Sequence, residues 1–395
     1  MNRFSAAGAA LLLLLVSAAP ASAQSLFSTR GLGVPTPAVD ARAAALGGIG
    51  VGLIGFHTSL VNPAEFAGIT RRGVSAALQP VSSTTQVDGE EDSTSGTRFP
   101  LLTILYPFGE RTVLNVGYGS YLEQSWAVQS EGVVIIDGRP VGVTDLIQST
   151  GGIAQLRVGA AYSVTPRLAL GVAAGLLTGN VERVALRRFA VDTASEGGGL
   201  RDFEERIRWN YLAPMASVGV RWDIAGRFRV GATAMAGGKV EADVREGDGE
   251  ERTYDAPLEF AAGASARLSP LFLVNAGGAW SRMPGTSGET VTRETVRIGG
   301  GLEYQGVRSG LRTYPVRLGA RWSQLPYHLA DETAPTEWAA GVGLGFRLGD
   351  PANPAAVADI SVERGERDGL AGGAVQGGLN ERHWRFTFSL SVFGN

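Results

Sequence analysis

Cysteine is absent from the whole chain of 395 residues, and histidine occurs only three times, at His57, His328 and His383. Without cysteine there is no disulfide framework, no thiolate metal site and no cysteine nucleophile. The histidines fall in the N-terminal region, a loop and a strand start, so no Ser/His/acid set converges and we expect neither an enzyme nor a cofactor. A strong charge excess is also missing. The net charge of −3 and the pI near 5.8 argue against nucleic acid as a partner.

Long apolar runs are confined to the start of the chain. Arg3 precedes an apolar stretch at Ala9–Ala19 and the small residues Ala21-Ser22-Ala23, which is the pattern of a secretory signal peptide over 1–23. That stretch is short for a transmembrane helix, and no later one could span a bilayer in that way. We therefore expect the chain to leave the cytoplasm and, once processed, to begin at Gln24.

What the chain has in quantity is a two-residue alternation. Apolar side chains occupy every second position in several stretches, namely 156–164, 168–176, 227–239, 296–304, 314–322 and 384–392. This period predicts β-strands with one face of Leu, Val, Phe, Trp and Tyr and another of Gly, Ser, Thr, Arg and Glu. An outer-membrane barrel turns the apolar face to lipid and the polar face to a watery lumen.

The alternation divides into about fourteen strands, an even number as single-chain bacterial barrels require. The expected spans are 73–83, 98–108, 111–127, 151–164, 167–179, 207–223, 226–242, 256–268, 270–282, 292–305, 311–325, 336–348, 355–365 and 382–393. The connections alternate between short turns and long loops, and within the loop 128–150 we expect an extra hairpin that turns at Asp137-Gly138. Short turns face the periplasm in such barrels, so both termini should be periplasmic.

The two faces of these strands can be assigned residue by residue. We expect lipid contact, with aromatics at the strand ends, for Val218, Val220, Trp222, Phe260, Trp280, Trp322, Trp338 and Trp384. Arginine on a lipid face would cost about 2–4 kcal/mol. We therefore place in the lumen Arg157, Arg221, Arg229, Arg267, Arg297, Arg317, Arg321, Arg347, Arg385, Glu259, Glu303 and Glu363. These charges either pair with one another or form a selectivity ring.

The last strand ends in an aromatic residue. The stretch Trp384–Phe393 resembles the C-terminal signal that the barrel-assembly machinery reads, although Phe393 breaks the parity of the outward set and two residues follow it. The barrel-assembly machinery is therefore an expected partner, together with outer-membrane lipid.

The residues between the signal peptide and the first strand, 24–72, do not alternate. They are rich in Ala and Gly, and Gly47–Gly55 has the spacing of a phosphate loop without the preceding strand or the following Lys-Ser/Thr. Because a segment of this size cannot fold alone, we expect it to fill the barrel as a plug. The chain thus divides into a signal peptide (1–23), a plug or hatch (24–72) and a transmembrane barrel (73–395).

Two short motifs in this segment resemble a known family. Asp40–Gly48 and Asn62-Pro63-Ala64-Glu65-Phe66-Ala67 resemble the N-terminal hatch of the FadL superfamily of hydrophobic-compound transporters, including its PorV/PorQ-like branch, with Glu65 where that family has Gly. The resemblance implies passive uptake of a hydrophobic small molecule, such as a long-chain fatty acid, with release when the hatch shifts. It also implies a sideways opening near an inward-kinked third strand, where Gly117 and Gly119 lie.

Roles for individual hatch residues follow from this resemblance. Asn62 would tie the plug to the barrel wall while Pro63 fixes the turn before Ala64. The apolar residues Leu53, Ile54, Phe56 and Leu60 would either line a ligand pocket or simply pack. A water-filled porin is disfavoured because the plug would block it.

The main alternative is an interaction protein. A PorV-like barrel would serve as a docking or structural subunit of a secretion or surface assembly, with protein partners at the extracellular loops, above all at 180–206 and 366–381. A groove of apolar character at the outer face would favour transport, whereas a closed polar mouth would favour docking.

Overall fold

The computed structural model describes residues 25–29, 31–87, 89–190, 201–285, 294–306, 308–309, 312–326, 334–350, 354–369 and 379–394. The expected signal peptide and His328 lie outside these ranges.

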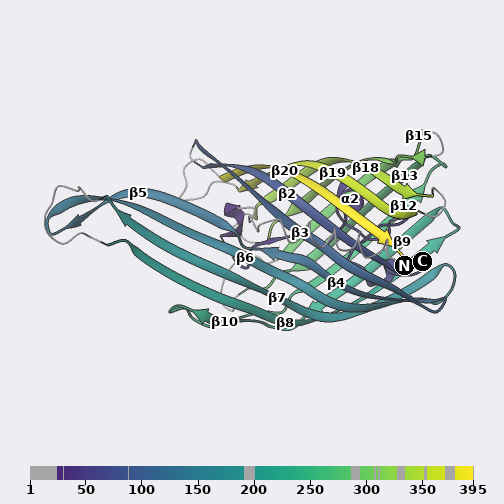
Figure 1. Cartoon of the computed structure of the whole chain (residues 1–395), viewed down its shortest axis with the longest axis horizontal. Helices are drawn as coiled ribbons and strands as arrows, with labels where there is room; N and C mark the ends of the chain where they lie inside the picture. Colours follow the sequence, from purple (N-terminus) through teal and green to yellow (C-terminus); the bar gives the residue numbers. More distant parts are fainter. Residues whose placement is uncertain are drawn as a thin grey trace.

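Fourteen tilted strands close into one antiparallel barrel (Figure 1). Around the wall they are β2 (Gly73–Val87), β3 (Glu90–Phe108), β4 (Thr112–Glu123), β6 (Arg139–Ser163), β7 (Leu168–Phe189), β8 (Phe203–Ile224), β9 (Phe228–Gly237), β12 (Leu258–Arg267), β13 (Phe272–Arg282), β14 (Glu294–Tyr304), β17 (Val316–Gln324), β18 (Thr336–Gly349), β19 (Pro354–Gly369) and β20 (Leu379–Phe393). Strand β20 pairs back with β2, from Gly73 opposite Phe393 to Val87 opposite Leu379, which closes the wall. The expected all-β fold with fourteen strands is confirmed.

Several strands are longer than expected at one end. Stretches 90–97, 144–150, 180–189 and 203–206, which we expected to be loop, continue β3, β6, β7 and β8, and β6 also includes the second arm of the expected hairpin. The expected strand 111–127 is wrong in its second half, because β4 ends at Glu123 and β5 (Trp126–Ile136) begins a new hairpin with β6. That hairpin turns at Asp137-Gly138, both with positive φ, as predicted. Figure 1 shows β5 to β8 extending as a ribbon beyond the rest of the barrel.

Shorter elements complete the two ends of the barrel. β10 (Val240–Glu246) separates from the expected strand 226–242 and pairs with β8 and β11 (Arg252–Tyr254). A small hairpin of β15 (Arg308–Ser309) and β16 (Arg312–Thr313) replaces the start of the expected strand 311–325. We call the end with the β3–β4, β6–β7 and β8–β9 turns the short-turn end and the opposite one the long-loop end.

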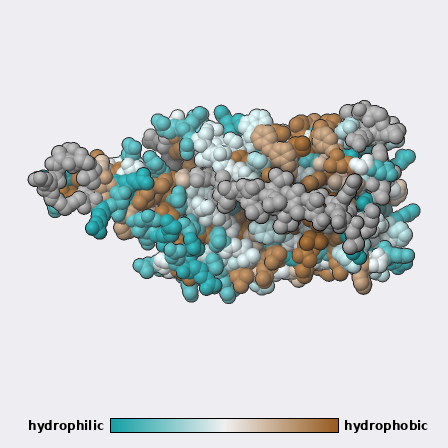
Figure 2. Space-filling model, in the orientation of Figure 1, coloured by the Kyte–Doolittle hydropathy of each residue, from teal (hydrophilic) through white to brown (hydrophobic). Residues whose placement is uncertain are grey.

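The outer face of the barrel carries an apolar belt. Ile104, Val158, Val218 and Leu318 are each more than half exposed, while their inward neighbours Thr103 and Arg317 are buried. Aromatic side chains mark both edges of this belt, with Trp280, Trp322, Trp338 and Trp384 toward the long-loop end and Phe108, Tyr162, Trp222, Phe228 and Tyr304 toward the short-turn end. Figure 2 shows the hydrophobic surface gathered over the short-turn half. Such a belt with aromatic girdles matches a lipid-facing wall.

The N-terminal segment, 25–72, lies inside the barrel. It contains η1 (Leu26–Ser28), β1 (Val34–Pro35), the helix α2 (Ala41–Ala45) and η2 (Pro63–Phe66), and most of its residues are buried against the inner wall. No helix in the described part of the chain is long and apolar enough to cross a membrane. The lumen is therefore filled rather than watery across the middle of the barrel.

Candidate functional site in the barrel interior

Glycines on the wall let the N-terminal segment pack directly against the strands. A Cβ at Gly319, Gly299 or Gly263 would collide with the backbone carbonyl of Ala45, Gly47 or Val51, respectively. The segment thus crosses β17, β14 and β12 in turn, with its backbone where side chains would otherwise stand. These inward glycines therefore leave room for the segment.

Asn62 joins the segment to strand β8. Its Oδ1 accepts the N–H of Ala64 at 3.0 Å, which caps η2, and its Nδ2 donates to the carbonyl of Val220 at 3.2 Å. Wall glycines receive this turn, because a Cβ at Gly219 would collide with Asn62 and one at Gly171 with the Pro63–Ala64 backbone.

Glu65, which departs from the family pattern, closes the same turn from inside. Its Oε1 accepts the N–H of Gly52 at 2.7 Å and lies 3.3 Å from Asn62 Nδ2. The side chain is fully buried, and burial raises the pKa of this carboxyl. Glu65 therefore links the two ends of the glycine-rich loop 52–65.

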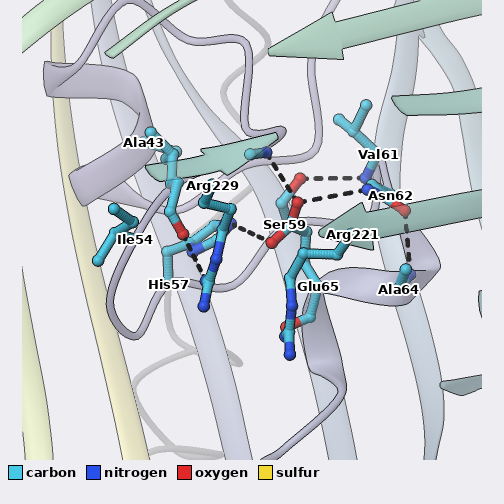
Figure 3. Close-up of polar contacts among 12 residues, drawn as sticks. Ala43, Ile54, His57, Ser59, Val61, Asn62, Ala64, Glu65, Arg221 and Arg229 are labelled. Carbon is cyan, nitrogen blue, oxygen red and sulfur yellow. Dashed lines mark hydrogen bonds and ion pairs between the residues drawn. The ribbon is translucent and has the colours of Figure 1, made fainter. Parts of the chain in front are cut away.

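Two wall arginines reach the segment from the short-turn side (Figure 3). Arg221 donates to the carbonyls of Glu65 and Ala67 at 3.2 and 2.6 Å, and Arg229 donates to that of Leu53 at 2.8 Å. Both also pair with Asp223. These lumen-facing charges therefore hold the backbone of the segment.

A first buried ion network joins the helix α2 to the opposite wall. Arg42 contacts Glu303 at 2.8 Å, Glu303 contacts Arg317 at 2.7 Å, and Arg317 contacts Asp359 at 2.6 Å. Arg42 also donates to the carbonyl of Ile54 at 2.7 Å. Because Arg42 is the member on the segment, this network ties segment and wall together.

A second buried network lies on β17 to β20, nearer the long-loop end. Glu337 contacts Arg321, Arg367 and Arg385 at 2.9, 2.6 and 2.9 Å. Arg321 also pairs with Glu363, and Arg367 with Glu381. Of the arginines that we expected in the lumen, Arg267 and Arg347 lie instead at the short-turn mouth, where both are exposed.

Asp40 organises the start of the helix α2. Its Oδ1 caps the helix by accepting the N–H of Ala43 at 2.8 Å, and its Oδ2 accepts that of Thr58 at 2.6 Å. Burial, reinforced by the negative charge of Asp359, raises the pKa of Asp40 to about 6.

An apolar inner cluster, which the sequence analysis missed, fills the long-loop half of the lumen. Its members are Leu32, Tyr121, Leu122, Ile153, Leu177, Val181, Trp209, Tyr211, Ala213, Met215, Met235, Val240, Ala242, Tyr254 and Met283. The expectation of a polar lumen is wrong in this region. On β7 to β10 apolar residues occur on both faces, and that loss of alternation beyond the belt was the available signal.

A small chamber adjoins this cluster and contains an arginine without a partner. The chamber measures about 60 Å³ and is lined by residues that include Leu60, Met235, Arg157, Glu259 and Arg297. Arg157 is 2% exposed, and its Nε and Nη2 have no hydrogen-bond partner among the described residues. Of the predicted lumen charges, Glu259 and Arg297 line the same chamber. A buried, unpaired guanidinium is costly and calls for a reason.

The apolar residues of the segment that the sequence analysis singled out lie in different parts of the barrel interior. Leu53 is buried in a small cluster with Val39, Ala43, Ala44 and Leu46. Leu60 packs against β4, since a Cβ at Gly117 or Gly119 would collide with its side chain. Ile54 and Phe56 lie nearer the short-turn end, where Phe56 packs edge-on against Phe393 at 5.0 Å between ring centroids.

The regular strand pairing of the wall is interrupted on β4 just after Gly117 and Gly119. The β4–β6 register shifts between Ser120 and Leu122, and β3 pairs with β4 only up to Leu101 opposite Gly119. Beyond that point β1 of the segment pairs with β4 at Leu122 and Glu123. A groove of about 660 Å³ extends from here across β6, β7 and β8, with Arg98, Tyr118, Ser120 and Thr36 among its lining.

Comparisons with known proteins give one family-model match and several similar solved structures, which support the barrel architecture. A family model described as BamG matches residues 1–197. The structure is similar to a Pseudomonas aeruginosa FadL homologue, with a TM-score of 0.61 at 15% identity over 92% of this chain and 99% of that chain. It is also similar to the Pseudomonas putida toluene transporter TodX (TM-score 0.52, 12% identity, 93% and 99%) and to the CymD monoaromatic hydrocarbon channel (0.51, 15%, 92% and 98%). No curated protein sequence matches significantly.

Proposed function

We propose that this chain, whose fold is that of a FadL-like β-barrel, carries hydrophobic molecules passively across the outer membrane, and that its preferred ligand bears an anionic head, as a long-chain fatty acid does. The short-turn end then faces the periplasm together with both termini. The similar solved structures include a FadL homologue, a toluene transporter and a monoaromatic hydrocarbon channel, which supports hydrophobic cargo in general.

The observation that supports an anionic head group on the ligand is the unpaired guanidinium of Arg157. Its guanidinium is buried at the edge of the apolar inner cluster, and no salt bridge within the described chain involves it. A carboxylate there would restore the missing charge partner with charge-assisted hydrogen bonds. The chamber of about 60 Å³ has room for a head group, and the acyl chain would displace side chains of the apolar inner cluster.

The apolar inner cluster is suited to such a rearrangement. Three of its members are methionines, Met215, Met235 and Met283, whose unbranched side chains repack at low cost. The ligand would then leave when the segment shifts, and the break in β3–β4 pairing beyond Gly119 offers a sideways route through the groove.

The test is uptake by cells that lack other transporters of this kind. We expect the protein to increase uptake of a labelled long-chain fatty acid and of a small aromatic hydrocarbon. Arg157→Gln should reduce uptake of the acid several-fold and leave the uncharged hydrocarbon unaffected. Arg187→Gln, which removes an exposed arginine paired with Asp145 on the ribbon, is the matched control.

Stability separates this role from a structural one. Since Arg157 is an unpaired buried charge, Arg157→Gln should leave the urea midpoint of the barrel unchanged or raise it. A marked fall in that midpoint, or equal loss of both compounds at matched surface levels, would contradict an anion-binding role.

A second candidate is a docking or structural barrel in a surface or barrel-assembly complex. The match of the BamG model over residues 1–197 favours it, because that range includes the segment, β5 and most of the ribbon. Among the strands that the structure describes, β5 pairs with β6 alone and so presents a free edge for strand addition. Crosslinking from Glu131 on β5 to barrel-assembly components, together with absence of uptake, would move the assignment to this function.

A further inference from the structure

A second pocket lies at the short-turn end, on the other side of the N-terminal segment from Arg157. It measures about 460 Å³, and its walls come from the segment at 55–57 and 65–71 and from β8, β9, β18, β19 and β20. It has no lining residue in common with the Arg157 chamber. The two pockets are therefore distinct sites, and the inference below does not rest on the transport proposed above.

Positive charge dominates this pocket. Four arginines line it, namely Arg71, Arg221, Arg229 and Arg347. One carboxylate, Asp223, serves both Arg229 at 2.6 Å and Arg221 at 3.4 Å. Arg71 is engaged with the carbonyls of Pro354 and Phe393. No salt bridge or hydrogen bond in the described chain engages Arg347, which projects from the end of β18 into the mouth.

Buried polar atoms at the back of the pocket also lack partners. His57 is 3% exposed, and its Nε2 has no hydrogen-bond partner in the described chain. Its Nδ1 lies 3.3 Å from the carbonyl of Gly55, which can only accept, so Nδ1 carries the proton and Nε2 is an acceptor without a donor. Glu65 Oε2, 4.0 Å away, is likewise unpartnered. Burial lowers the pKa of His57 to about 3, so the ring is neutral.

The remaining wall is apolar. Phe56 and Phe393 pack edge to face, and Ile69 and Val357 extend the same surface. Phe393 reaches the pocket because its side chain points inward at the end of β20. The sequence already indicated this, since Phe393 breaks the alternation of the outward residues on that strand. Cations beside an aromatic and aliphatic wall suit an amphiphile better than a bare ion.

We propose that this pocket binds an anionic group, a phosphate monoester or a phospholipid phosphate, carried on an apolar body. Arg347 and Arg221 would hold the phosphate oxygens while Phe56 and Phe393 cover the adjoining apolar part. A hydroxyl on the ligand would supply the donor that His57 Nε2 lacks. Free molecules in the periplasm and lipid of the inner leaflet are the two sources of this chemistry.

The test uses the full barrel in phosphatidylcholine nanodiscs, titrated calorimetrically with hexyl phosphate and with inorganic phosphate. We expect hexyl phosphate to bind more tightly than inorganic phosphate. Arg347→Gln should weaken hexyl phosphate roughly tenfold, the loss of about one charge-assisted contact. Phe56→Ala should remove most of the preference for hexyl phosphate over inorganic phosphate.

Arg267→Gln is the matched control, because Arg267 is exposed at the same end on β12 and does not line the pocket. Nanodiscs that contain phosphatidylglycerol separate the two sources: weaker hexyl phosphate binding there identifies lipid as a competitor, and unchanged binding identifies a free anion. The proposal is overturned if the unaltered barrel binds no hexyl phosphate, or if Arg347→Gln and Arg267→Gln bind it as the unaltered barrel does.

Discussion

The two halves of the inner wall hold the same N-terminal segment by different means. From β14 to β20 the wall presents charged side chains, with Glu303, Arg317 and Asp359 meeting Arg42 of the segment. From β7 to β12 the segment packs on glycines such as Gly219, where it occupies the space that side chains would fill, and Arg221 and Arg229 donate to its backbone carbonyls. Glycine contacts of the same kind recur at Gly299 and Gly319 on β14 and β17. Glycine contacts therefore occur in both halves, and the half from β14 to β20 differs in having a buried ion network that includes Arg42 of the segment.

This difference teaches what each half can tolerate. A buried ion network fails when one member is removed, because the remaining charges stay desolvated and unpaired. A glycine contact fails when anything is added. The charged half should also respond to pH through Asp40.

The largest effect should come from breaking the second charge network. Glu337→Gln leaves Arg321, Arg367 and Arg385 without their shared carboxylate, so we expect a loss of about 3–5 kcal/mol in the free energy of unfolding. The measurement is urea unfolding of the barrel in lipid vesicles. The control, Glu294→Gln, breaks the exposed pair with Arg282 and should cost less than about 1 kcal/mol. Equal effects of the two variants would refute the importance of burial.

The pH response of the charged half should depend on Asp40. Its pKa is raised from 3.8 to about 6, so between these values the unfolded chain loses its proton first and stability falls as pH rises. The penalty is on the order of 3 kcal/mol at neutral pH. Asp40→Asn, which retains a capping side chain, should flatten this slope. Urea midpoints from pH 4 to 7 measure it, and parallel slopes for both proteins would contradict the assignment.

On the glycine half, Gly219→Ala should cost about 1–3 kcal/mol, because its methyl group must displace Asn62 from the wall. We also expect a looser segment, seen as increased ion conductance in planar bilayers. Gly132→Ala on the ribbon is the control, since the added carbon has only ordinary contacts there. Equal costs of Gly219→Ala and Gly132→Ala would contradict the close contact of Gly219 with Asn62.

The sequence predicted the barrel better than its contents. Alternation of period two identified all fourteen strands and the outward Trp222, Trp322, Trp338 and Trp384, because every second residue of a strand must suit lipid. The extension of β6 to β8 was missed because a solvated ribbon has polar residues on both faces. Such a pattern lacks the alternation that predicts a strand, so we expected loops there.

The interior was harder to predict because its partners are distant in sequence. The pairing of Arg42 with Glu303 depends on how the segment crosses the wall, and no local pattern encodes it. Arg157 was placed correctly in the lumen as one of many arginines, yet its lack of a partner appears only when the surroundings of all of them are compared. The sequence shows that glycines such as Gly219 are abundant on the strands, but it does not show which of them contact the N-terminal segment.

The most direct test of the central claim is to locate a bound fatty acid. A long-chain fatty acid with a photoreactive diazirine next to its carboxylate would be bound to the purified barrel, irradiated and mapped by mass spectrometry. We predict crosslinks to the residues around Arg157, such as Gln155, Met235 and Tyr121, that disappear in Arg157→Gln. Crosslinks confined to the outer apolar belt, unchanged in that variant, would contradict an interior ligand site.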